Sequence, residues 1–178
     1  MDDRLEPVYE TALAHLNGRS LQQAKDEEIS TMLAGADREL FIKGKEIYSM
    51  DGYCSTCHQN DGGGLGASGF PPLAGTQWVL GNKERLIKLV LNGLQGPLEV
   101  LGKEYPGQVP MTPFGGLLDD EELAAVLTYV RNSFGNQASP ISPELVGKVR
   151  NETKDYTGYY SPEALLEEYP MESETASR

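Results

Sequence analysis

The amino-acid sequence predicts an all-α fold, on three observations. Three segments space their apolar residues three and four apart, as one face of a helix requires, and turn residues bound each segment. No stretch shows the sustained alternation of apolar and polar residues that is typical of a half-buried strand. The 178 residues have room for one sizeable core, so we expect the helices to share it.

The first predicted helix runs toward the two cysteines of the chain. Asp37 is placed to cap it, and Phe41, Gly44 and Tyr48 follow on one face. Because glycine has no side chain, we expect Gly44 to let a second helix approach closely.

The other two predicted helices have clear start signals. Asn82 is placed to cap the second helix, and Gly93 follows its last turn as a terminating residue. Asp119 caps the third, and Glu122 stands three residues later, as in a capping box. The apolar positions are Leu86, Leu89 and Val90 in the second helix, and Leu123, Val126, Leu127, Val130 and Phe134 in the third.

Charge divides the chain into three parts, which we expect to be an extension over residues 1–36, a central domain over 37–137 and an acidic extension over 138–178. Residues 1–39 hold nine acids and four bases, and residues 141–178 hold eight and four. The first extension is either helical, with Leu21, Ala24, Glu28 and Met32 placed to pack, or a linker from a preceding domain. The second contains one more short helical pattern that starts at Ser161 and Pro162.

Composition excludes two classes of partner. The formal charge of −12 argues against binding of nucleic acid, which needs a basic surface to neutralise phosphates. No apolar run approaches the roughly 18 residues of a membrane span, and the first 30 residues contain no apolar stretch of signal-peptide type. We therefore expect no membrane span and no export signal in this chain.

The strongest motif is CSTCH, which contains both cysteines of the chain. Cys-x-x-Cys-His is the attachment signal for c-type haem, in which the thiols of Cys54 and Cys57 add to the vinyl groups and the imidazole of His58 binds the iron. Two long loops rich in glycine and proline, at 60–75 and 94–116, lack secondary-structure patterns of their own. One covalently attached haem c would supply the core that such loops need.

The second axial position of the iron has three candidates: a methionine, the other histidine His15, or no ligand. Met1, Met32 and Met171 lie in the extensions, and Met50 is too close to the motif to reach the opposite face of a haem. Met111 lies 53 residues after His58, between prolines that stiffen the chain. Met111 is therefore favoured as the ligand, with an unbound core methionine as the alternative.

Residues 37–135 resemble a class I c-type cytochrome. The resemblance rests on GKEIY before CSTCH, on FPPLAG after it, on the methionine loop and on the helix AAVLTYVR. It implies the fold of that family, in which Gly44 and Tyr48 cross Val126 and Tyr129. The loop departs from the commoner form of the family, because MTPF stands in place of Met-Pro.

The resemblance also implies roles for residues around the haem. Pro71 and Leu73 match a Pro-x-Leu segment whose proline carbonyl accepts a hydrogen bond from the proximal histidine, here His58. The indole of Trp78 is a candidate donor to a haem propionate, with a plain core role as the alternative. Tyr105 is a candidate for a hydrogen bond near the ligand sulfur or a propionate, with a surface or core tyrosine as the alternative. Arg85 and Lys88 are candidates to neutralise a propionate, with a solvated helix face as the alternative.

The segments PPLAGTQWV and NGLQGPLEVLGKEYPG are similar to cytochrome c domains appended to larger periplasmic or envelope proteins, such as sugar and alcohol dehydrogenases. This implies a periplasmic or envelope location and a redox protein or an attached catalytic domain as partner. The sequence sets no oligomeric state.

The favoured function is transfer of single electrons through a His/Met-ligated haem, which has no open site for a substrate. The first alternative is a haem enzyme or gas sensor that binds peroxide, oxygen or nitric oxide at a labile axial position. The second is a structural zinc site of Cys54, Cys57 and His58, for which the adjacent Cys and His are poorly spaced.

Overall fold

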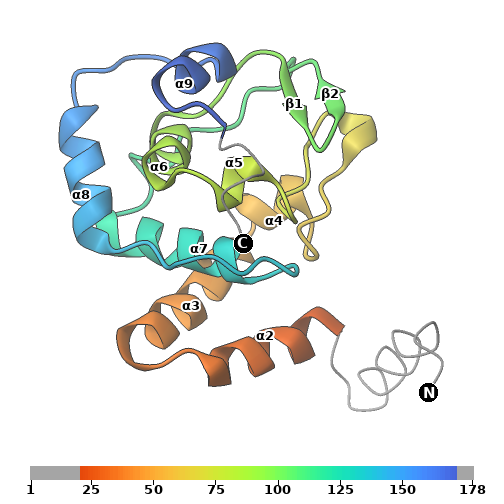
Figure 1. The fold of residues 1–178 in the computed structure, drawn as a ribbon, viewed down its shortest axis with the longest axis vertical. Coiled ribbons are helices and arrows are strands. Elements are labelled where there is room, and N and C mark those ends of the chain that lie inside the picture. Colours follow the sequence, from red (N-terminus) through yellow and green to blue (C-terminus); the bar gives the residue numbers. More distant parts are fainter. Residues whose placement is uncertain (1–20, 172–178) are drawn as a thin grey trace.

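The computed structural model describes residues 21–171 and forms one helical body (Figure 1). Its longer helices are α2 (Leu21–Met32), α3 (Gly35–Tyr48), α6 (Lys83–Asn92), α7 (Asp120–Asn132) and α8 (Pro143–Glu152). The shorter elements are α4 (Cys54–His58), the 3-10 turn η1 (Gly66–Ser68), α5 (Gln77–Leu80), β1 (Leu98–Val100), β2 (Lys103–Tyr105) and α9 (Pro162–Glu168). Between residues 21 and 171, no helix is long and apolar enough to cross a membrane.

The helices α3 and α7 cross at the centre of the fold, as predicted. A Cβ atom on Gly44 would overlap the carbonyl oxygen of Ala125 and lie 2.9 Å from the Cβ of Tyr129, so only glycine allows this approach. Beside the crossing, the rings of Tyr48 and Phe134 pack around Tyr129 with centroids 5.3 and 5.6 Å from it. The closest neighbour of Gly44 is thus Ala125 rather than the predicted Val126.

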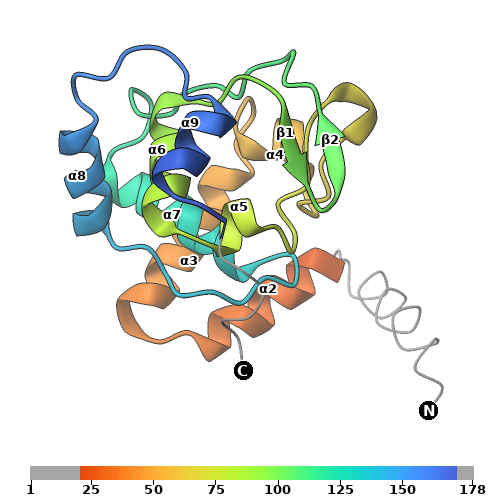
Figure 2. The ribbon, with the colours of Figure 1, turned by 45° about the horizontal axis from the view of Figure 1, so that its top comes forward.

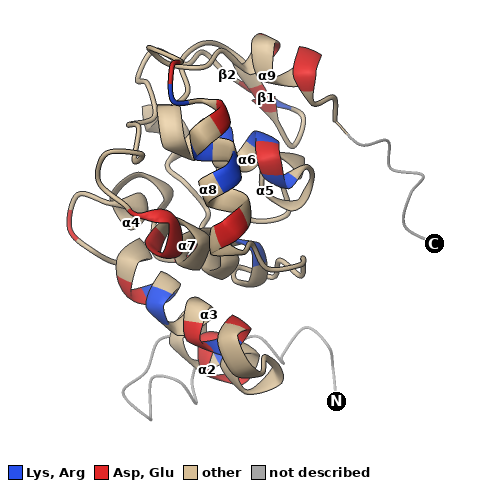
Figure 3. Ribbon diagram, turned by 90° about the vertical axis from the view of Figure 1, so that its left-hand side faces the viewer, with Lys and Arg blue, Asp and Glu red and all other residues tan. Residues whose placement is uncertain are grey.

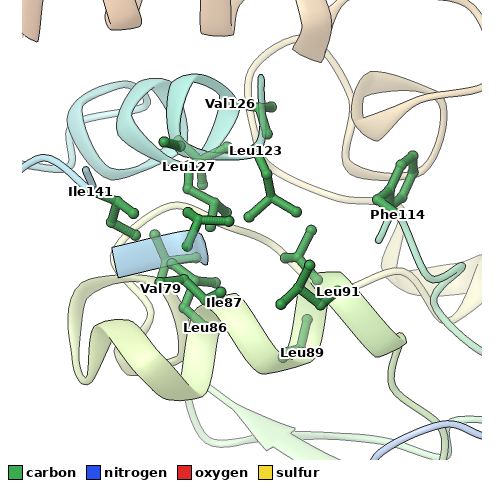
Figure 4. Close-up of a cluster of buried hydrophobic side chains, with 14 of the residues drawn as sticks. Val79, Leu86, Ile87, Leu89, Leu91, Phe114, Leu123, Val126, Leu127 and Ile141 are labelled. Carbon is green, nitrogen blue, oxygen red and sulfur yellow. The ribbon is translucent and has the colours of Figure 1, made fainter. Parts of the chain in front are cut away.

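A second layer, formed by α5 and α6, packs against the other side of α7 and completes the core. Figure 4 shows side chains of these helices gathered in one cluster. Among its members are Val79, Leu86, Ile87, Leu91, Leu123, Leu127 and Ile141, all of which are buried.

The predicted helix starts are correct for two of the three helices. The side chain of Asn82 accepts from Arg85 N, and Asp119 and Glu122 form both hydrogen bonds of a capping box. The prediction for Asp37 is wrong, because α3 begins earlier, at Gly35, and Asp37 lies in its first turn. There a carboxylate still faces the positive end of the helix dipole.

The antiparallel hairpin β1–β2 was not expected. Each strand has only three residues, too few to show alternation in the sequence. The two connecting residues, Leu101 and Gly102, have φ values of +51° and +74°, which suit a tight hairpin turn. The all-α class holds, since the hairpin is a small addition to a helical protein.

The C-terminal extension contains two helices where one was predicted. The expected helix is α9, and the Ser161 side chain caps it. The unexpected one is α8, which packs on α6 and α7 with Val146 and Val149 fully buried. Figure 2 shows α9 lying over α6.

The N-terminal helix α2 is attached by a different residue from those predicted. Glu28 and Met32 are exposed, and Met32 keeps 75% of its surface. The buried residue is Asp26, which is 2% exposed and faces α3 and α7. Leu21 and Ala24 are partly buried, so the expected packing is wrong only for Glu28 and Met32.

Candidate functional site

The helix α4 presents the haem-attachment motif. Cys54 and Cys57 are three residues apart and so lie on the same side of its single turn, and His58 is its last residue. The chain then turns sharply at Gln59, whose φ is +62°. Tyr48 of α3 donates its hydroxyl to the carbonyl of Gln59 at 2.6 Å, which fixes this turn to the central helix crossing.

His58 is held by one hydrogen bond to the backbone. Its Nδ1 lies 2.9 Å from the carbonyl oxygen of Pro71, and the side chain is 9% exposed. Because a carbonyl oxygen only accepts, Nδ1 carries the proton, and Nε2 is left to bind a metal. Burial lowers the pKa of His58, so the imidazole is neutral, the form that binds iron.

The glycine-rich loop brings Pro71 to His58. Gly64 N donates to the His58 carbonyl at 3.0 Å, and Leu73 N donates to the Gly62 carbonyl at 2.7 Å. A Cβ on Gly64 would lie 2.5 Å from the Pro71 carbonyl oxygen, and the φ of Gly64 is +69°. The only signal for Gly64 in the sequence is the glycine content of the loop, which does not distinguish it from its neighbours.

Met111 lies on an extended segment that pairs with Leu94. Leu94 N donates to the Met111 carbonyl at 3.3 Å, and Met111 N donates to the Leu94 carbonyl at 2.9 Å. Three residues later, Phe114 N donates to the carbonyl of Val90 in α6. The methionine backbone is thus held on both sides, and its side chain is partly buried against the core.

The donor set fits a covalently bound haem. Cys54, Leu73 and Met111 are all partly buried at the edge of the hydrophobic core, where a haem would extend that core. Burial raises the pKa of the Cys54 thiol to about 11, so it is protonated at neutral pH. Two thiols, an imidazole and a thioether are the groups that attach haem c and fill both axial positions of its iron.

Trp78 and Tyr105 are both linked to the hairpin β1–β2. The Trp78 indole donates to the carbonyl of Glu99 in β1 at 3.0 Å, so its single donor already joins α5 to the hairpin. Tyr105 is buried in β2 opposite Leu98, with the Lys103 ammonium 5.1 Å from its ring centre. Their contacts to a propionate or sulfur stay predictions.

Arg85 and Lys88 both contact the C-terminal extension. Arg85 is fully buried and donates to the carbonyls of Tyr169, Pro170 and Gln77. Lys88 pairs with Glu168 at 2.5 Å, and its ammonium lies 4.9 Å from the ring centre of Tyr169. Both side chains are buried, so the alternative that they form a solvated face is wrong. A contact of either cation with a propionate stays a prediction.

The remaining candidates from the sequence are His15 and a zinc site. His15 lies outside the described residues. Within residues 21–171, no three His, Cys, Asp or Glu side chains form a group that could hold a metal ion. The zinc alternative thus has no additional ligand in the part of the chain that the structure describes.

Comparison with known proteins identifies the family. The family model described as Cytochrome c matches residues 41–134, which span α3 to the end of α7. The chain belongs to the cytochrome c family. It is therefore a class I c-type cytochrome that carries electrons and binds haem c covalently, and its role is electron transfer rather than catalysis.

Three relatives illustrate this family match. Cytochrome c-552 of Thermus thermophilus is 39% identical over 116 residues, which cover 60% of this chain and 83% of that protein. The cytochrome c subunit of the quinone alcohol dehydrogenase of Komagataeibacter europaeus is 32% identical over 114 residues, 64% of this chain but 23% of the subunit. The cbb3-type cytochrome c oxidase subunit FixP of Bradyrhizobium diazoefficiens is 31% identical over 134 residues, covering 41% of its length.

Proposed function

We propose that this cytochrome binds one haem through thioether bonds to Cys54 and Cys57, with His58 and Met111 as the axial ligands of the iron. The observation that carries the proposal is the hydrogen bond between His58 and the Pro71 carbonyl, because it leaves only Nε2 to bind. The pairing of Met111 with Leu94 supports the second ligand, since it fixes the backbone that carries the thioether.

These residues favour rapid transfer of single electrons. A haem with both axial sites filled supplies the redox change, and a thioether ligand raises the reduction potential. Pro71 keeps the imidazole of His58 in one tautomer and one orientation in both redox states. Because the backbone at residues 58 and 111 is held by hydrogen bonds, little rearrangement accompanies the change of charge.

The partner that we propose is a dehydrogenase or oxidase complex. The chain is either a subunit of it or meets it in brief encounters, in which it accepts electrons from a dehydrogenase or donates them to an oxidase. The relatives that carry the words dehydrogenase or oxidase in their names support this class of partner.

We place the haem domain at residues 37–137, with the acidic extensions on either side, in the periplasm or cell envelope. Figure 3 shows acidic residues on α2, at the start of α7 and on α9, a distribution that suits a partner with a basic surface.

Carbon monoxide binding to the dithionite-reduced protein tests the ligand set. With Met111 on the iron, the visible haem bands of the wild-type protein stay unchanged, and Met111→Ala makes them shift promptly on addition of the gas. Met50→Ala is the matched control, because Met50 is 48% exposed and lies outside the methionine loop. A prompt shift in the wild-type protein contradicts the proposal and favours a labile site of the enzyme or gas-sensor type.

A second measurement tests the attachment. The haem should stay with the polypeptide on acid-acetone extraction, at a ratio of one per chain. Replacement of both Cys54 and Cys57 by alanine should release it, since no thioether bond then remains.

A further inference from the structure

We propose that the C-terminal extension positions the axial ligand, so that the docking of α9 sets how often Met111 leaves the iron. This inference rests on the proposed function, in which Met111 is that ligand. Its basis is a continuous row of three extended segments, in which the segment of Leu94 lies between those of Met111 and Tyr160.

Leu94 is the central member of this row. On one side it exchanges both of its backbone hydrogen bonds with Met111, at 2.9 and 3.3 Å. On the other side, its neighbours bond to the extension: Gln95 N donates to the Tyr160 carbonyl at 2.9 Å, and Tyr160 N donates to the Gly93 carbonyl at 3.1 Å. Every step from Tyr160 to Met111 is therefore a backbone contact.

Gly93 packs between the same two segments. A Cβ on Gly93 would lie 2.5 Å from the Met111 carbonyl oxygen and 2.7 Å from Cδ1 of Tyr159. The ring of Tyr159 therefore lies against Gly93, which is also next to the Met111 carbonyl. Since φ of Gly93 is +77°, this is also the point where α6 has ended and helical hydrogen bonds no longer hold the chain.

The extension is itself held firmly beyond Tyr160. Leu165 of α9 is fully buried, Pro162 at its start is buried, and Lys88 of α6 pairs with Glu168 at its end. The guanidinium of Arg85 binds the two carbonyls that follow the helix. Loosening α9 removes this support from Leu94, and the segment of Met111 then opens more often.

The experiment is capture of the ferric haem by added imidazole, which binds only when Met111 has left the iron. Leu165→Ala removes a fully buried side chain from α9, and Val146→Ala removes one from α8, which has no place in the row. Both variants lose core packing, but we expect only Leu165→Ala to speed capture, by about tenfold or more. Leu165→Ile should restore the wild-type rate to within about threefold.

Rates are compared at low urea concentrations, and a capture rate that does not rise with urea reports local opening rather than global unfolding. Tyr159→Ala is a second test, because this side chain is 42% exposed and its loss uncovers Gly93 without emptying the core. We expect it to speed capture by about threefold or more, by the same local opening.

Two results separate failure of the inference from failure of the proposed ligand. The long-wavelength absorption band of a thioether-bound ferric haem reports the ligand in the wild-type protein, and its absence overturns the assignment of Met111. If the band is present and Leu165→Ala captures imidazole no faster than Val146→Ala, Met111 is the ligand but the extension does not position it. Equal rates for Tyr159→Ala and the wild-type protein contradict the inference in the same way.

Discussion

The two extensions of this cytochrome are both acidic, yet they attach to the haem domain in opposite ways. The N-terminal helix α2 is joined through a buried carboxylate, Asp26, and has little buried apolar surface. The C-terminal extension buries Val146, Val149 and Leu165 completely, and it adds backbone carbonyls that bind Arg85. The two extensions have similar charge, yet the N-terminal one is attached by polar contacts and the C-terminal one is part of the hydrophobic core.

The polar attachment depends on partners from three helices. Asp26 accepts from the hydroxyl of Tyr129 at 3.0 Å and from Ser133 at 3.3 Å, both at the far end of α7 from its capping box. It also pairs with Lys45 of α3 at 3.0 Å and accepts from Gln22 of its own helix. A buried carboxylate is tolerated here because all of these donors compensate for the loss of water.

The first prediction concerns the C-terminal extension. Arg85→Met should lower the free energy of unfolding by about 3 kcal/mol, because the buried guanidinium and its three charge-assisted hydrogen bonds to partly buried carbonyls are lost. Urea unfolding of the haem-loaded protein, followed by far-ultraviolet circular dichroism, measures the change. Arg38→Met is the control, since Arg38 is exposed on α3. An equal effect of the two substitutions would show that the extension contributes no such contact to stability.

The second prediction concerns the N-terminal attachment. Asp26→Ala should cost about 2 kcal/mol, since Tyr129 and Ser133 lose a buried acceptor and Lys45 loses its counterion. Glu28→Ala, an exposed acid of the same helix, should change the free energy of unfolding by less than about 0.5 kcal/mol. If Asp26→Ala is as mild as its control, the buried network does not hold α2.

The third prediction uses pH to isolate one contact of α9. Burial lowers the pKa of Lys88, but hydrogen bonds to Glu168 and Tyr169 outweigh it and raise the pKa from 10.5 to about 12. The folded protein therefore binds this proton more tightly than the unfolded chain does, and the pair stabilises the fold below pH 10.5. That stabilisation is lost as the pH rises toward 12.

Glu168→Gln is the variant for this test. It should cost about 0.5–1 kcal/mol at neutral pH, because the Glu168 side chain is partly exposed. The difference from the wild-type protein should shrink as the pH rises above 10.5, which urea unfolding at a series of pH values will measure. A difference that stays constant across this range assigns the effect to packing rather than to charge.

The smallest expected effect is the coupling between the two ends. Arg85 and Asp26 share no hydrogen-bond or ion-pair partner among those identified, so the double variant Arg85→Met/Asp26→Ala should lose the sum of the single losses to within about 0.5 kcal/mol. The same urea experiment provides the value. A larger coupling would mean that the two extensions act on a common element, for which α7 is the candidate.

The accuracy of the sequence predictions differs between local and long-range features. The caps at Asn82, Asp119 and Ser161 are correct because a cap involves residues only three positions apart. Helix α8 starts with the same Ser-Pro-Glu pattern as α9 but was missed, since Gly147 weakens the helical pattern after Val146. The hairpin was missed because each strand has three residues, too few to show an alternation of apolar and polar side chains.

The chemistry of this protein can be inferred from adjacent residues of its sequence. Cys54, Cys57 and His58 are adjacent in the chain, so their spacing identifies a haem attachment without any knowledge of the fold. Gly44 likewise indicated a close helix crossing, because the absence of a side chain can be read directly.

The burial of charged side chains, in contrast, depends on how the helices pack. Arg85 and Lys88 look like surface or propionate-binding cations in the sequence, and Asp26 looks like one of many solvated acids. Whether such a group is buried depends on acceptors and donors 80 to 103 residues away, at Glu168 and Tyr169 for the first two and at Tyr129 for the third. Hydrogen bonds between residues so distant leave no periodic pattern in the chain, so they become visible only when the helices are packed.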